Sequence, residues 1–584
     1  MVVSHGSSKT SYGLNASQQV LHPLLALVAG VCLLVLIGWT GEVTTWQHRW
    51  TVLIGIVYAL ERGWLFLKTR ASHPRGHKPN YRVMLPVLVL CISVTLLSEA
   101  GRKSLGGHLC VQAAVLVSGL ALVISHQTRF TKRAFHPGLV LIGSFLFLVL
   151  SGALLLKMPL CTVSGQTCSW LDAFFTSTSA VCVTGLSVQN TAMFFTTTGQ
   201  VVILLLIQVG GLGIMTLTFF AAVVLFEGLS LHDRLLLGKM IQENRLARIG
   251  ETLKFIILMT FVCEITGAVI LFFSMDGIPE ISNRLYQAVF HSISAFCNAG
   301  FSTLPDGLAS HLLDENWIWQ VVIMALIVIG GLGALANEDL SFWVVAKIRR
   351  LFKLDGQRHR LRVHTRLVLV TTVALILLGT AAILISEFYL WKGPENGGRV
   401  LTAFFHSITA RTAGFNTVSM SQIGPLTAQV LMILMIIGGS PGGTAGGLRT
   451  TVAAVGLAHL WRQLRMGPRG MVIFNRSIST ETGSRALGLI LLTGIWLACN
   501  FVVLEILQAG TGVSESALLF ELISAFATVG LSLDLTPTLT SAAKTLLIVN
   551  MFVGRIGLLT VMATLIKQDS RPASGKPKEE IILT

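Results

Sequence analysis

Four short segments of this sequence share one pattern, in which small and weakly polar residues surround a central glycine. The segments are SAVCVTGLS from Ser179, SAFCNAGFS from Ser294, ITARTAGFN from Ile408 and SAFATVGLS from Ser524. Their central glycines, spaced 115, 114 and 116 residues apart, are Gly185, Gly300, Gly414 and Gly530. A fixed period of this length indicates that one structural unit occurs four times in the chain.

Residues on both sides of each glycine are in phase as well. Before the glycine lies a segment with aromatic residues, too short to cross a membrane: WLDAFFTSTSA, LYQAVFHSISA, LTAFFHSITA and LLFELISA. Between 24 and 30 residues after it, a glycine cluster begins inside the next apolar run, at Gly210, Gly330, Gly438 and Gly554. Each unit is therefore predicted to contain a span, a short helix, a glycine-centred loop and a second span.

The composition places these units in a membrane. Hydrophobic residues make up 53% of the chain and charged residues 12%, whereas soluble domains have roughly 25% charged residues. Apolar runs such as 139–156, 201–226 and 367–385 approach or exceed the roughly 20 residues that cross a bilayer core. The chain is therefore predicted to be a multi-pass α-helical membrane protein.

The spacing of the units predicts the organisation of the whole chain. The predicted parts are residues 135–245 for repeat 1, 250–350 for repeat 2, 365–465 for repeat 3, 485–567 for repeat 4, and 568–584 for a cytoplasmic tail. Residues 1–130 form an N-terminal extension with four predicted transmembrane helices, at 21–40, 51–67, 84–98 and 109–125. The first apolar run lacks a convincing cleavage site and is interpreted as an uncleaved span. The extension has no regular arginine series, and we interpret it as peripheral packing.

The distribution of charge predicts the orientation. The formal net charge is +16, which could indicate a nucleic-acid or anionic partner. However, the basic residues gather in alternate loops, at 68–82, 129–133, 234–254, 347–366 and 462–485. Basic loops face the cytoplasm, so the pattern predicts a cell (inner) membrane protein with both termini cytoplasmic, surrounded by membrane lipid and without a nucleic-acid partner.

The four glycine-centred loops limit what the fold can be. Irregular backbone at membrane depth is tolerated only where protein buries it or where it lines a water-filled cavity. Four equivalent loops can meet on one axis, and glycine allows their carbonyl groups to point inward and replace the hydration shell of a cation. The predicted fold is all-α, with four span–pore-loop–span repeats around a pseudo-fourfold pore. Close helix packing through small residues is the alternative; it explains the later glycine clusters but not four phased loops.

These segments, together with IGGSPGGTAGGLRT and MFVGRIGLLT, resemble the Trk/Ktr/HKT superfamily of potassium transporters, in particular its TrkH/KtrB-type pore-forming subunits. The likeness extends in order from residue 135 to residue 567 and is specific as a set. It implies potassium uptake across the cell membrane through a channel-like pore. In this family glycine at all four central positions accompanies K⁺ selectivity, so K⁺ is the expected substrate. A sodium-permeable or sodium-coupled cation transporter of the same fold is the alternative.

The resemblance implies one quarter of a selectivity filter in each repeat. Carried over position by position, the filter residues are Cys182, Val183, Thr184, Gly185, Cys297, Asn298, Ala299, Gly300, Arg411, Thr412, Ala413, Gly414, Ala527, Thr528, Val529 and Gly530. Within this set the implied K⁺ sites are at Val183, Thr184, Asn298, Ala299, Thr412, Ala413, Thr528 and Val529. The charge of Arg411 would repel K⁺ on the axis, so we expect this side chain to point away and brace its loop.

A glycine-rich run inside repeat 3 predicts a broken helix. Interior glycines cost a helix roughly 1 kcal/mol each and proline about 3 kcal/mol. The run consists of Gly438, Gly439, Ser440, Pro441, Gly442, Gly443, Thr444, Ala445, Gly446 and Gly447. The resemblance implies that it is an intramembrane gating loop below the filter; a kinked helix filled by neighbouring side chains is the alternative.

Two charged residues inside apolar segments are further candidates. Arg555 lies within a span, where charged residues usually face a cavity or a partner. The resemblance implies that Arg555 forms an electrostatic barrier in the pore as part of the gate, and an ion pair with Glu505 is the alternative. Glu521 lies in the short helix of repeat 4, where the other repeats have Thr176, His291 and His406. Glu521 either concentrates cations near the outer mouth or anchors its helix, and the sequence does not decide between the two roles.

Other function classes are disfavoured. We find no catalytic constellation such as HExxH, so the chain is not expected to be an enzyme. The four units have the same orientation in the membrane, which argues against a transporter built from inverted repeats. The chain has no P-loop or Rossmann fingerprint and so no predicted nucleotide site; its ligand is potassium as substrate. The resemblance implies a homodimer and a cytoplasmic nucleotide-binding regulatory subunit.

The nine cysteines form no metal motif. Cys161 and Cys168 lie in a predicted outer loop, where a disulfide between them is the less favoured alternative to free thiols.

Overall fold

The fold is described from a computed structural model of the chain. The structure describes residues 137–164, 166–213, 249–275, 280–309, 317–352, 359–387, 396–465 and 471–565. The predicted spans within 1–130 and the tail 568–584 lie outside the described residues, as does most of the basic segment 234–254.

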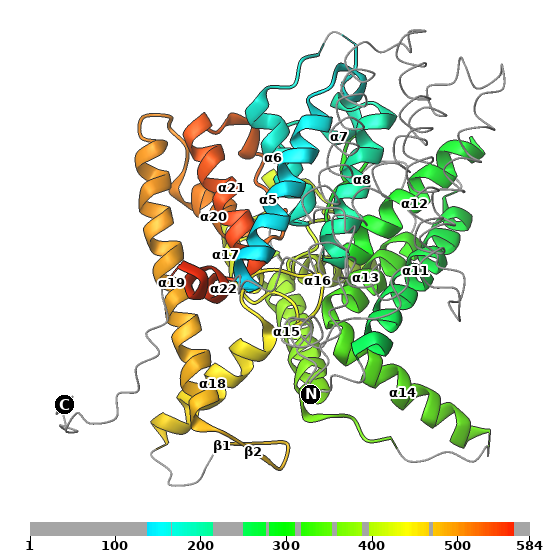
Figure 1. Ribbon diagram of the computed structural model, residues 1–584, viewed down its shortest axis with the longest axis vertical. Coiled ribbons are helices and arrows are strands. Elements are labelled where there is room, and N and C mark those ends of the chain that lie inside the picture. Colours follow the sequence, from blue (N-terminus) through cyan, green and yellow to red (C-terminus); the bar gives the residue numbers. More distant parts are fainter. Residues whose placement is uncertain are drawn as a thin grey trace, which may run out of the picture.

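The described helices follow one order along the chain: a long helix, a short helix that ends in a glycine-centred loop, and another helix (Figure 1). In the first part these are α5 (Pro137–Leu156), η1 (Pro159–Cys161), α6 (Trp170–Val181), α7 (Thr191–Phe194) and α8 (Thr197–Leu212). The second part has α11 (Ile249–Ser274), α12 (Ile281–Cys297), η2 (Gly307–Ala309), α13 (Trp317–Leu332) and α14 (Ala334–Leu351).

The second half of the chain continues this order. The third part has α15 (Val363–Glu387), α16 (Asn396–Thr409), η4 (Met420–Gln422), α17 (Pro425–Ile436) and α18 (Thr450–Leu464), followed by the antiparallel pair β1 (Met471–Ile473) and β2 (Arg476–Ile478). The fourth has α19 (Thr480–Leu507), α20 (Glu515–Ala527), η5 (Thr536–Thr538), α21 (Ser541–Ile556) and α22 (Leu558–Leu565). The prediction of a helical protein is confirmed.

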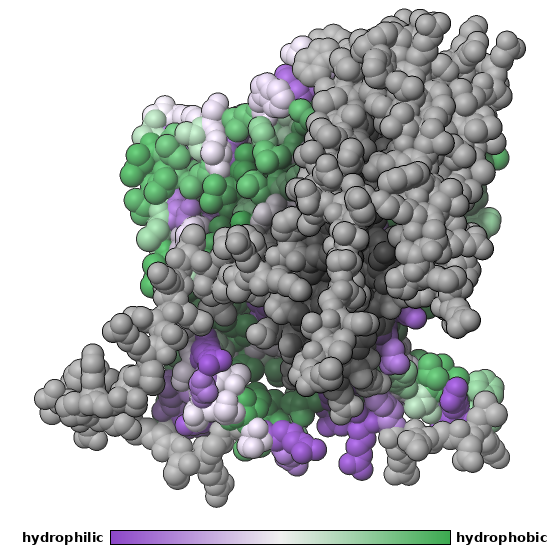
Figure 2. All heavy atoms as spheres, in the orientation of Figure 1, coloured by the Kyte–Doolittle hydropathy of each residue, from purple (hydrophilic) through white to green (hydrophobic). Residues whose placement is uncertain are grey.

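Several helices have the length and composition of membrane spans. Three of the described helices qualify alone, at Glu251–Ser274, Val363–Glu387 and Thr480–Leu507. Trp317–Leu332 and Ala334–Leu351 qualify together but are bent by 110° at the break between them. Figure 2 shows apolar side chains over the upper part of the visible described surface and hydrophilic ones gathered at the lower end. Leu258 and Phe273 of α11 are 67% and 73% exposed, as expected for side chains that face lipid.

The short helices pack on the long helices through a recurring serine and glycine. The hydroxyl groups of three serines donate to carbonyls of the preceding long helix: Ser177 to Val149 at 2.7 Å, Ser292 to Glu264 at 2.7 Å and Ser407 to Ile376 at 2.8 Å. The same serines lie against glycines that leave no room for a Cβ atom: Gly152, Gly267 and Gly379. The fourth part differs, because Leu522 occupies the serine position and Gly494 has no such neighbour.

The two cysteines of the predicted outer loop are free thiols. Cys161 and Cys168 are both buried and form no disulfide. Burial, with a smaller contribution from Cys168, raises the pKa of the Cys161 thiol to about 12. A thiol with such a pKa stays protonated at neutral pH, and the protonated form is the unreactive one. The less favoured disulfide alternative is therefore not what the structure contains.

Candidate functional site

The four central glycines contact one another in a closed cyclic order. A Cβ atom built on Gly185 would lie 3.2 Å from the Cα atom of Gly300, and one built on Gly300 would lie 3.0 Å from that of Gly414. From Gly414 the corresponding contact is with Gly530 at 3.2 Å, and from Gly530 it returns to Gly185 at 2.9 Å. Segments more than 100 residues apart in sequence thus meet at one place.

Each of the four segments has the same unusual backbone conformation. The glycines have φ values of 91°, 70°, 77° and 92°, and the residue two positions earlier also has a positive φ. These earlier residues are Val183 (56°), Asn298 (60°), Thr412 (78°) and Thr528 (52°). Positive φ is unusual for any residue other than glycine and an outlier for a β-branched one, costing on the order of 1–3 kcal/mol. Four such residues at equivalent positions indicate that the surrounding structure imposes this conformation.

Hydrogen bonds explain how the loops hold this conformation. The amide groups of the residues before each glycine donate back to the short helices: Thr184 to Ser179 at 2.7 Å, Ala299 to Ser294 at 2.7 Å, Ala413 to Thr409 at 2.9 Å and Val529 to Ser524 at 2.9 Å. The carbonyl oxygens of these same four residues lie beside the glycine of a neighbouring segment. The amides therefore point outward, toward the helices, and the carbonyls lie at the glycine ring.

Two hydroxyl groups next to the ring are unsatisfied. The Oγ1 atoms of Thr184 and Thr528 are buried and have no hydrogen-bond partner among the described residues. A buried polar atom without a partner is costly and usually marks a place for water or an ion. By contrast, the Arg411 side chain turns away from the glycines, because its Nη2 atom lies 3.4 Å from the hydroxyl of Thr372 in α15. This is the direction that we expected from its charge.

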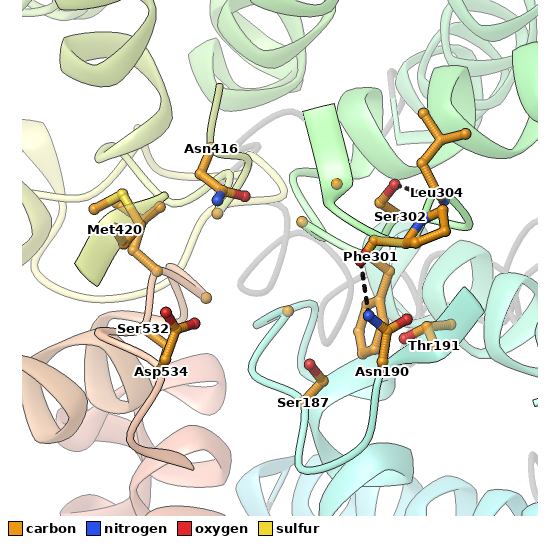
Figure 3. Close-up of a pocket in the computed structure, with 17 residues that line it drawn as sticks. Ser187, Asn190, Thr191, Phe301, Ser302, Leu304, Asn416, Met420, Ser532 and Asp534 are labelled. Atoms are coloured by element: carbon orange, nitrogen blue, oxygen red, sulfur yellow. Dashed lines mark hydrogen bonds between the residues drawn. The ribbon is translucent and has the colours of Figure 1, made fainter. Parts of the chain in front are cut away.

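A polar cavity of about 160 Å³ adjoins one side of the glycine ring (Figure 3). It is lined by the four glycines and by residues that follow them, including Ser187, Asn190, Asn416, Ser532 and Asp534. The side chain of Asn190 donates to the carbonyl of Pro305 at 2.7 Å and joins two of the loops. Among the described residues that line the cavity, Asp534 supplies the one carboxylate.

The Glu521 carboxylate is buried and anchors the short helix α20. It accepts hydrogen bonds from the hydroxyl of Thr536 at 2.8 Å and from that of Ser532, and it is 0% exposed. In α12 the equivalent His291 contacts the Ser302 hydroxyl at 2.8 Å, with the same spacing of eleven residues. The geometry favours the anchoring role of Glu521 over a role at the mouth.

The glycine-rich run 438–447 forms a loop on the other side of the ring. Helix α17 ends at Ile436 and α18 begins at Thr450, so the kinked-helix alternative is wrong. A Cβ atom on Gly446 would lie 2.9 Å from Cγ2 of Thr528, and one on Gly438 would lie 3.2 Å from that of Thr412. These threonines precede the glycines of the ring, whereas the cavity is lined by the glycines and the residues after them. The ring therefore separates the cavity from the loop.

Backbone hydrogen bonds attach this loop to the break between α13 and α14. The amide of Ser440 donates to Gly331 at 2.9 Å, and that of Thr444 is 3.4 Å from the Gly330 carbonyl. In return, the amide of Ala334 donates to Gly442 at 3.1 Å. The loop thus depends on the position of a neighbouring helix junction.

Two half-buried arginines bind carbonyl groups of the loop. Arg555 donates to the carbonyl of Gly210 at 2.6 Å and to that of Thr444. The ion pair with Glu505 is not formed, so this alternative is wrong. Arg449 donates to the carbonyl of Ala445 and lies 3.4 Å from that of Ser440. Arg449, two positions after the glycine run, was not among the sequence-predicted site residues.

The later glycine clusters pack against the ends of the short helices. Cβ atoms on Gly210, Gly330 and Gly554 would clash with the backbones of Val181, Phe296 and Phe526, respectively. Small residues here allow close approach, as the packing alternative requires. No group of three or more His, Cys, Asp or Glu side chains suited to a metal ion is present in the described part of the chain.

Comparisons with known proteins agree on one family. The sequence profile of TrkH, described as a cation transport protein, matches residues 111–574. The Ktr system potassium uptake protein B of Vibrio alginolyticus is 34% identical over 454 residues, which cover 77% of this chain and 95% of that protein. The potassium/sodium uptake protein NtpJ of Enterococcus hirae is 34% identical over 468 residues, covering 78% and 99%.

A solved structure supports the fold. The crystal structure of the potassium transporter TrkH from Vibrio parahaemolyticus aligns with a TM-score of 0.59 and 19% identity. The alignment covers 83% of this chain and 98% of that one.

Proposed function

Because the chain belongs to the TrkH family of cation transport proteins, we propose that it takes up potassium through a channel-like pore whose selectivity filter is the ring of glycine-centred loops. The closed order of contacts among Gly185, Gly300, Gly414 and Gly530 is the observation that carries the proposal. The names of its relatives, a potassium uptake protein and a potassium/sodium uptake protein, support monovalent cation uptake.

The proposed ion sites use backbone oxygen atoms. With amides bonded to the short helices and carbonyls at the ring, the oxygens of Val183, Thr184 and their equivalents would replace the hydration shell of K⁺. The unpartnered hydroxyls of Thr184 and Thr528 provide further oxygen atoms beside the ring. The polar cavity would be the outer mouth, from which hydrated ions enter.

We place the gate at loop 438–447. Its carbonyls are held by Arg555 and Arg449, and its amides by Gly330 and Gly331. A loop held by these bonds directly beside the ring would close the ion path on the inner side, and the charge of Arg555 would repel cations there. Opening requires these hydrogen bonds to break or exchange.

The repeats would form one pore per chain, within residues 135–567, and two chains would form a homodimer in the cell membrane with cytoplasmic termini. The name "Ktr system" of two relatives denotes a system of components, which supports a separate partner; we propose that this partner is a cytoplasmic nucleotide-binding regulatory subunit. The family consists of ion transporters, so no catalytic activity is proposed.

Growth of bacteria that lack potassium uptake tests the function. Expression of the chain, alone and with its regulatory subunit, should restore growth at low K⁺ and allow Rb⁺ entry. The absence of both in cells that contain the protein in the membrane, with and without the partner, would contradict the assignment.

Replacement of Gly185 by serine tests the filter. In the family that the chain resembles, glycine at all four central positions accompanies K⁺ selectivity, so G185S should shift the ratio of Rb⁺ to Na⁺ uptake toward Na⁺. The serine side chain would meet the Ala299 carbonyl and distort the ring. The readout is the uptake ratio in cells with equal membrane content; the variant G488S, at a glycine with no neighbour within 4 Å, is the control. An unchanged ratio in G185S with full uptake would contradict a filter at Gly185.

Neutralisation of Asp534 should weaken ion entry. The carboxylate lines the cavity and is exposed, so it should raise the local cation concentration. For D534N we expect the half-saturating Rb⁺ concentration to rise about two- to tenfold at low ionic strength, and less where salt screens the charge. The variant E280Q, which removes an exposed carboxylate at the N-cap of α12, is the control. An equal effect of both variants would contradict a specific role of Asp534.

Truncation of Glu521 should destabilise the protein. In E521A the hydroxyls of Ser532 and Thr536 lose their acceptor in a buried place, which costs about 1–3 kcal/mol each. We expect the midpoint of thermal unfolding of the purified protein to fall markedly. E515Q, at an exposed carboxylate of the same helix, should leave the midpoint nearly unchanged. If E521A changed only the half-saturating ion concentration, the role at the mouth would be correct instead.

A further inference from the structure

Helix α14 has a buried first half and an exposed second half. Ala336, Asn337, Glu338 and Asp339 are buried, whereas none of the residues 342–352 is buried. The side chain of Asp339 contacts His359 at 2.8 Å and accepts from the amide of Arg362 at 2.9 Å. The first half is therefore fixed in the protein, and the second half extends away from it.

The exposed half is amphipathic and basic. Phe342, Val345, Ile348 and Phe352, which recur every three or four residues, are 48%, 48%, 49% and 70% exposed. Such spacing places them on one face of a helix. Lys347 and Arg350 fall on the other face, where the Lys347 ammonium lies 4.9 Å from the centre of the Trp343 ring. The exposed Arg349 lies at the edge of the apolar face, next to Phe342. Residues 340–351 contain no acidic residue. This combination of apolar, aromatic and basic residues is typical of helices that lie in a membrane interface.

The direction of α14 fits such a position. The chain turns by 110° between α13 and α14, at Gly333, whose φ of 86° is a conformation that favours glycine. In Figure 1, α14 extends outward at the lower end of the molecule, and Figure 2 shows apolar and hydrophilic side chains next to each other at the same corner. The basic residues 347–350 belong to a loop that the charge pattern places in the cytoplasm.

The fixed end of α14 is bonded to the proposed gating loop. The Ala334 amide, at the first residue of the helix, donates to Gly442 at 3.1 Å. The Asn337 side chain donates to the Ile329 carbonyl of α13 at 2.8 Å and so holds the bend from inside. Because α14 is continuous from Ala334 to Leu351, a rotation of the whole helix would strain or break the contact between Ala334 and Gly442.

We propose that the exposed half of α14 binds anionic phospholipid headgroups at the cytoplasmic surface, and that this binding keeps loop 438–447 closed. The apolar face inserts at the boundary of the acyl chains, and Lys347 and Arg350 pair with the headgroups. A second copy of the chain or a cytoplasmic protein could cover the same face. The basic side chains complement the charge of anionic lipid, and α14 runs across the direction of the preceding helix α13. Both observations favour lipid as the occupant. The gating part of this inference rests on the proposed function.

Rb⁺ flux into vesicles tests the coupling. The purified full chain is reconstituted in phosphatidylcholine, alone or mixed with phosphatidylglycerol. Flux of the wild type should be severalfold lower in the anionic vesicles, and K347Q/R350Q should lose this difference. The control R476Q/R485Q removes two exposed arginines from the same end of the molecule and should keep the difference. Equal flux of the wild type in both lipids, or equal loss of the difference in both variants, overturns the proposal.

The variant A334P separates binding from coupling. Proline lacks the amide proton that bonds to Gly442, and it is well accepted at the first position of a helix. We expect its flux to be high in both lipids while its binding to the anionic membrane is retained. Flux of A334P that still falls severalfold in anionic vesicles overturns the coupling.

Lipid binding has a readout that does not depend on transport. A fluorophore attached to V345C should be quenched by nitroxide-labelled phosphatidylglycerol, and one attached to V472C in β1 should be quenched much less; the wild type measures labelling of native thiols. Quenching with no Rb⁺ flux in any vesicle would support the lipid site and contradict the proposed function. No quenching at V345C, or dissociation of an oligomer in K347Q/R350Q, overturns the lipid site.

Discussion

Replacement of Gly530 by alanine is expected to lower Rb⁺ flux at least tenfold. The residue has a φ of 92°, and an added Cβ would lie 2.9 Å from the Cα atom of Gly185 and closer still to the Thr184 carbonyl. Both neighbours are backbone atoms, which cannot rotate away as a side chain can. The clash must therefore widen the ring or turn the Thr184 carbonyl, and either change removes oxygen atoms from the proposed ion sites. The measurement is flux in vesicles with equal amounts of folded protein.

A matched control separates the clash from backbone strain. Gly510 lies in the same part of the chain and also has a positive φ, of 84°, but nothing lies within 4 Å of an added Cβ. Both alanine variants carry a similar strain of roughly 1 kcal/mol, so only the clash differs. G510A should retain flux near that of the wild type. Equal flux in G530A and G510A would contradict the filter.

Replacement of Arg555 by glutamine is expected to raise basal Rb⁺ flux at least tenfold, equivalent to about 1.4 kcal/mol less of a barrier. The guanidinium joins the Thr444 carbonyl of the loop to the Gly210 carbonyl of α8. Glutamine is shorter and neutral, so R555Q removes both the bridge and the positive charge. Flux in vesicles without the regulatory subunit measures the closed state.

The variant R555K distinguishes the two contributions of Arg555. Lysine keeps the charge but, as a single ammonium, cannot reproduce the planar fork that reaches two carbonyls. An intermediate flux is expected, above that of the wild type and below that of R555Q. The exposed Arg485, which pairs with Glu481, provides the control R485Q. Basal flux of R555Q at or below the wild-type value would contradict the role of Arg555 in closure.

Much of the fold was predictable because its signals are local. The break in repeat 3 follows from the cost of six glycines and one proline in a helix, and the structure has non-helical backbone from residue 437 to residue 449. The outward direction of Arg411 followed from its charge alone. The third segment is one residue shorter, because Ser407 lies seven positions before Gly414 whereas Ser177 and Ser292 lie eight positions before their glycines; similar loops therefore tolerate a one-residue difference.

The partners of the charged residues were not predictable in the same way. An ion pair of Arg555 with Glu505 was a reasonable alternative because a buried cation needs compensation. The structure instead provides carbonyl oxygens, which are left free where the loop and α8 have no helical partners. Arg449 was missed because a basic residue near a helix start has no distinctive pattern. Its role depends on the path of the loop around it.

The sequence by itself determined the family, the helical membrane fold and the positions at which helices stop, because apolar run length and glycine or proline content act over a few neighbouring residues. Only the tertiary structure decided which carbonyl each arginine binds, that Glu521 is enclosed by Ser532 and Thr536, and the order in which the four glycines contact one another. These contacts join residues up to 345 positions apart. Their partners are selected by packing of whole helices, for which no local pattern exists.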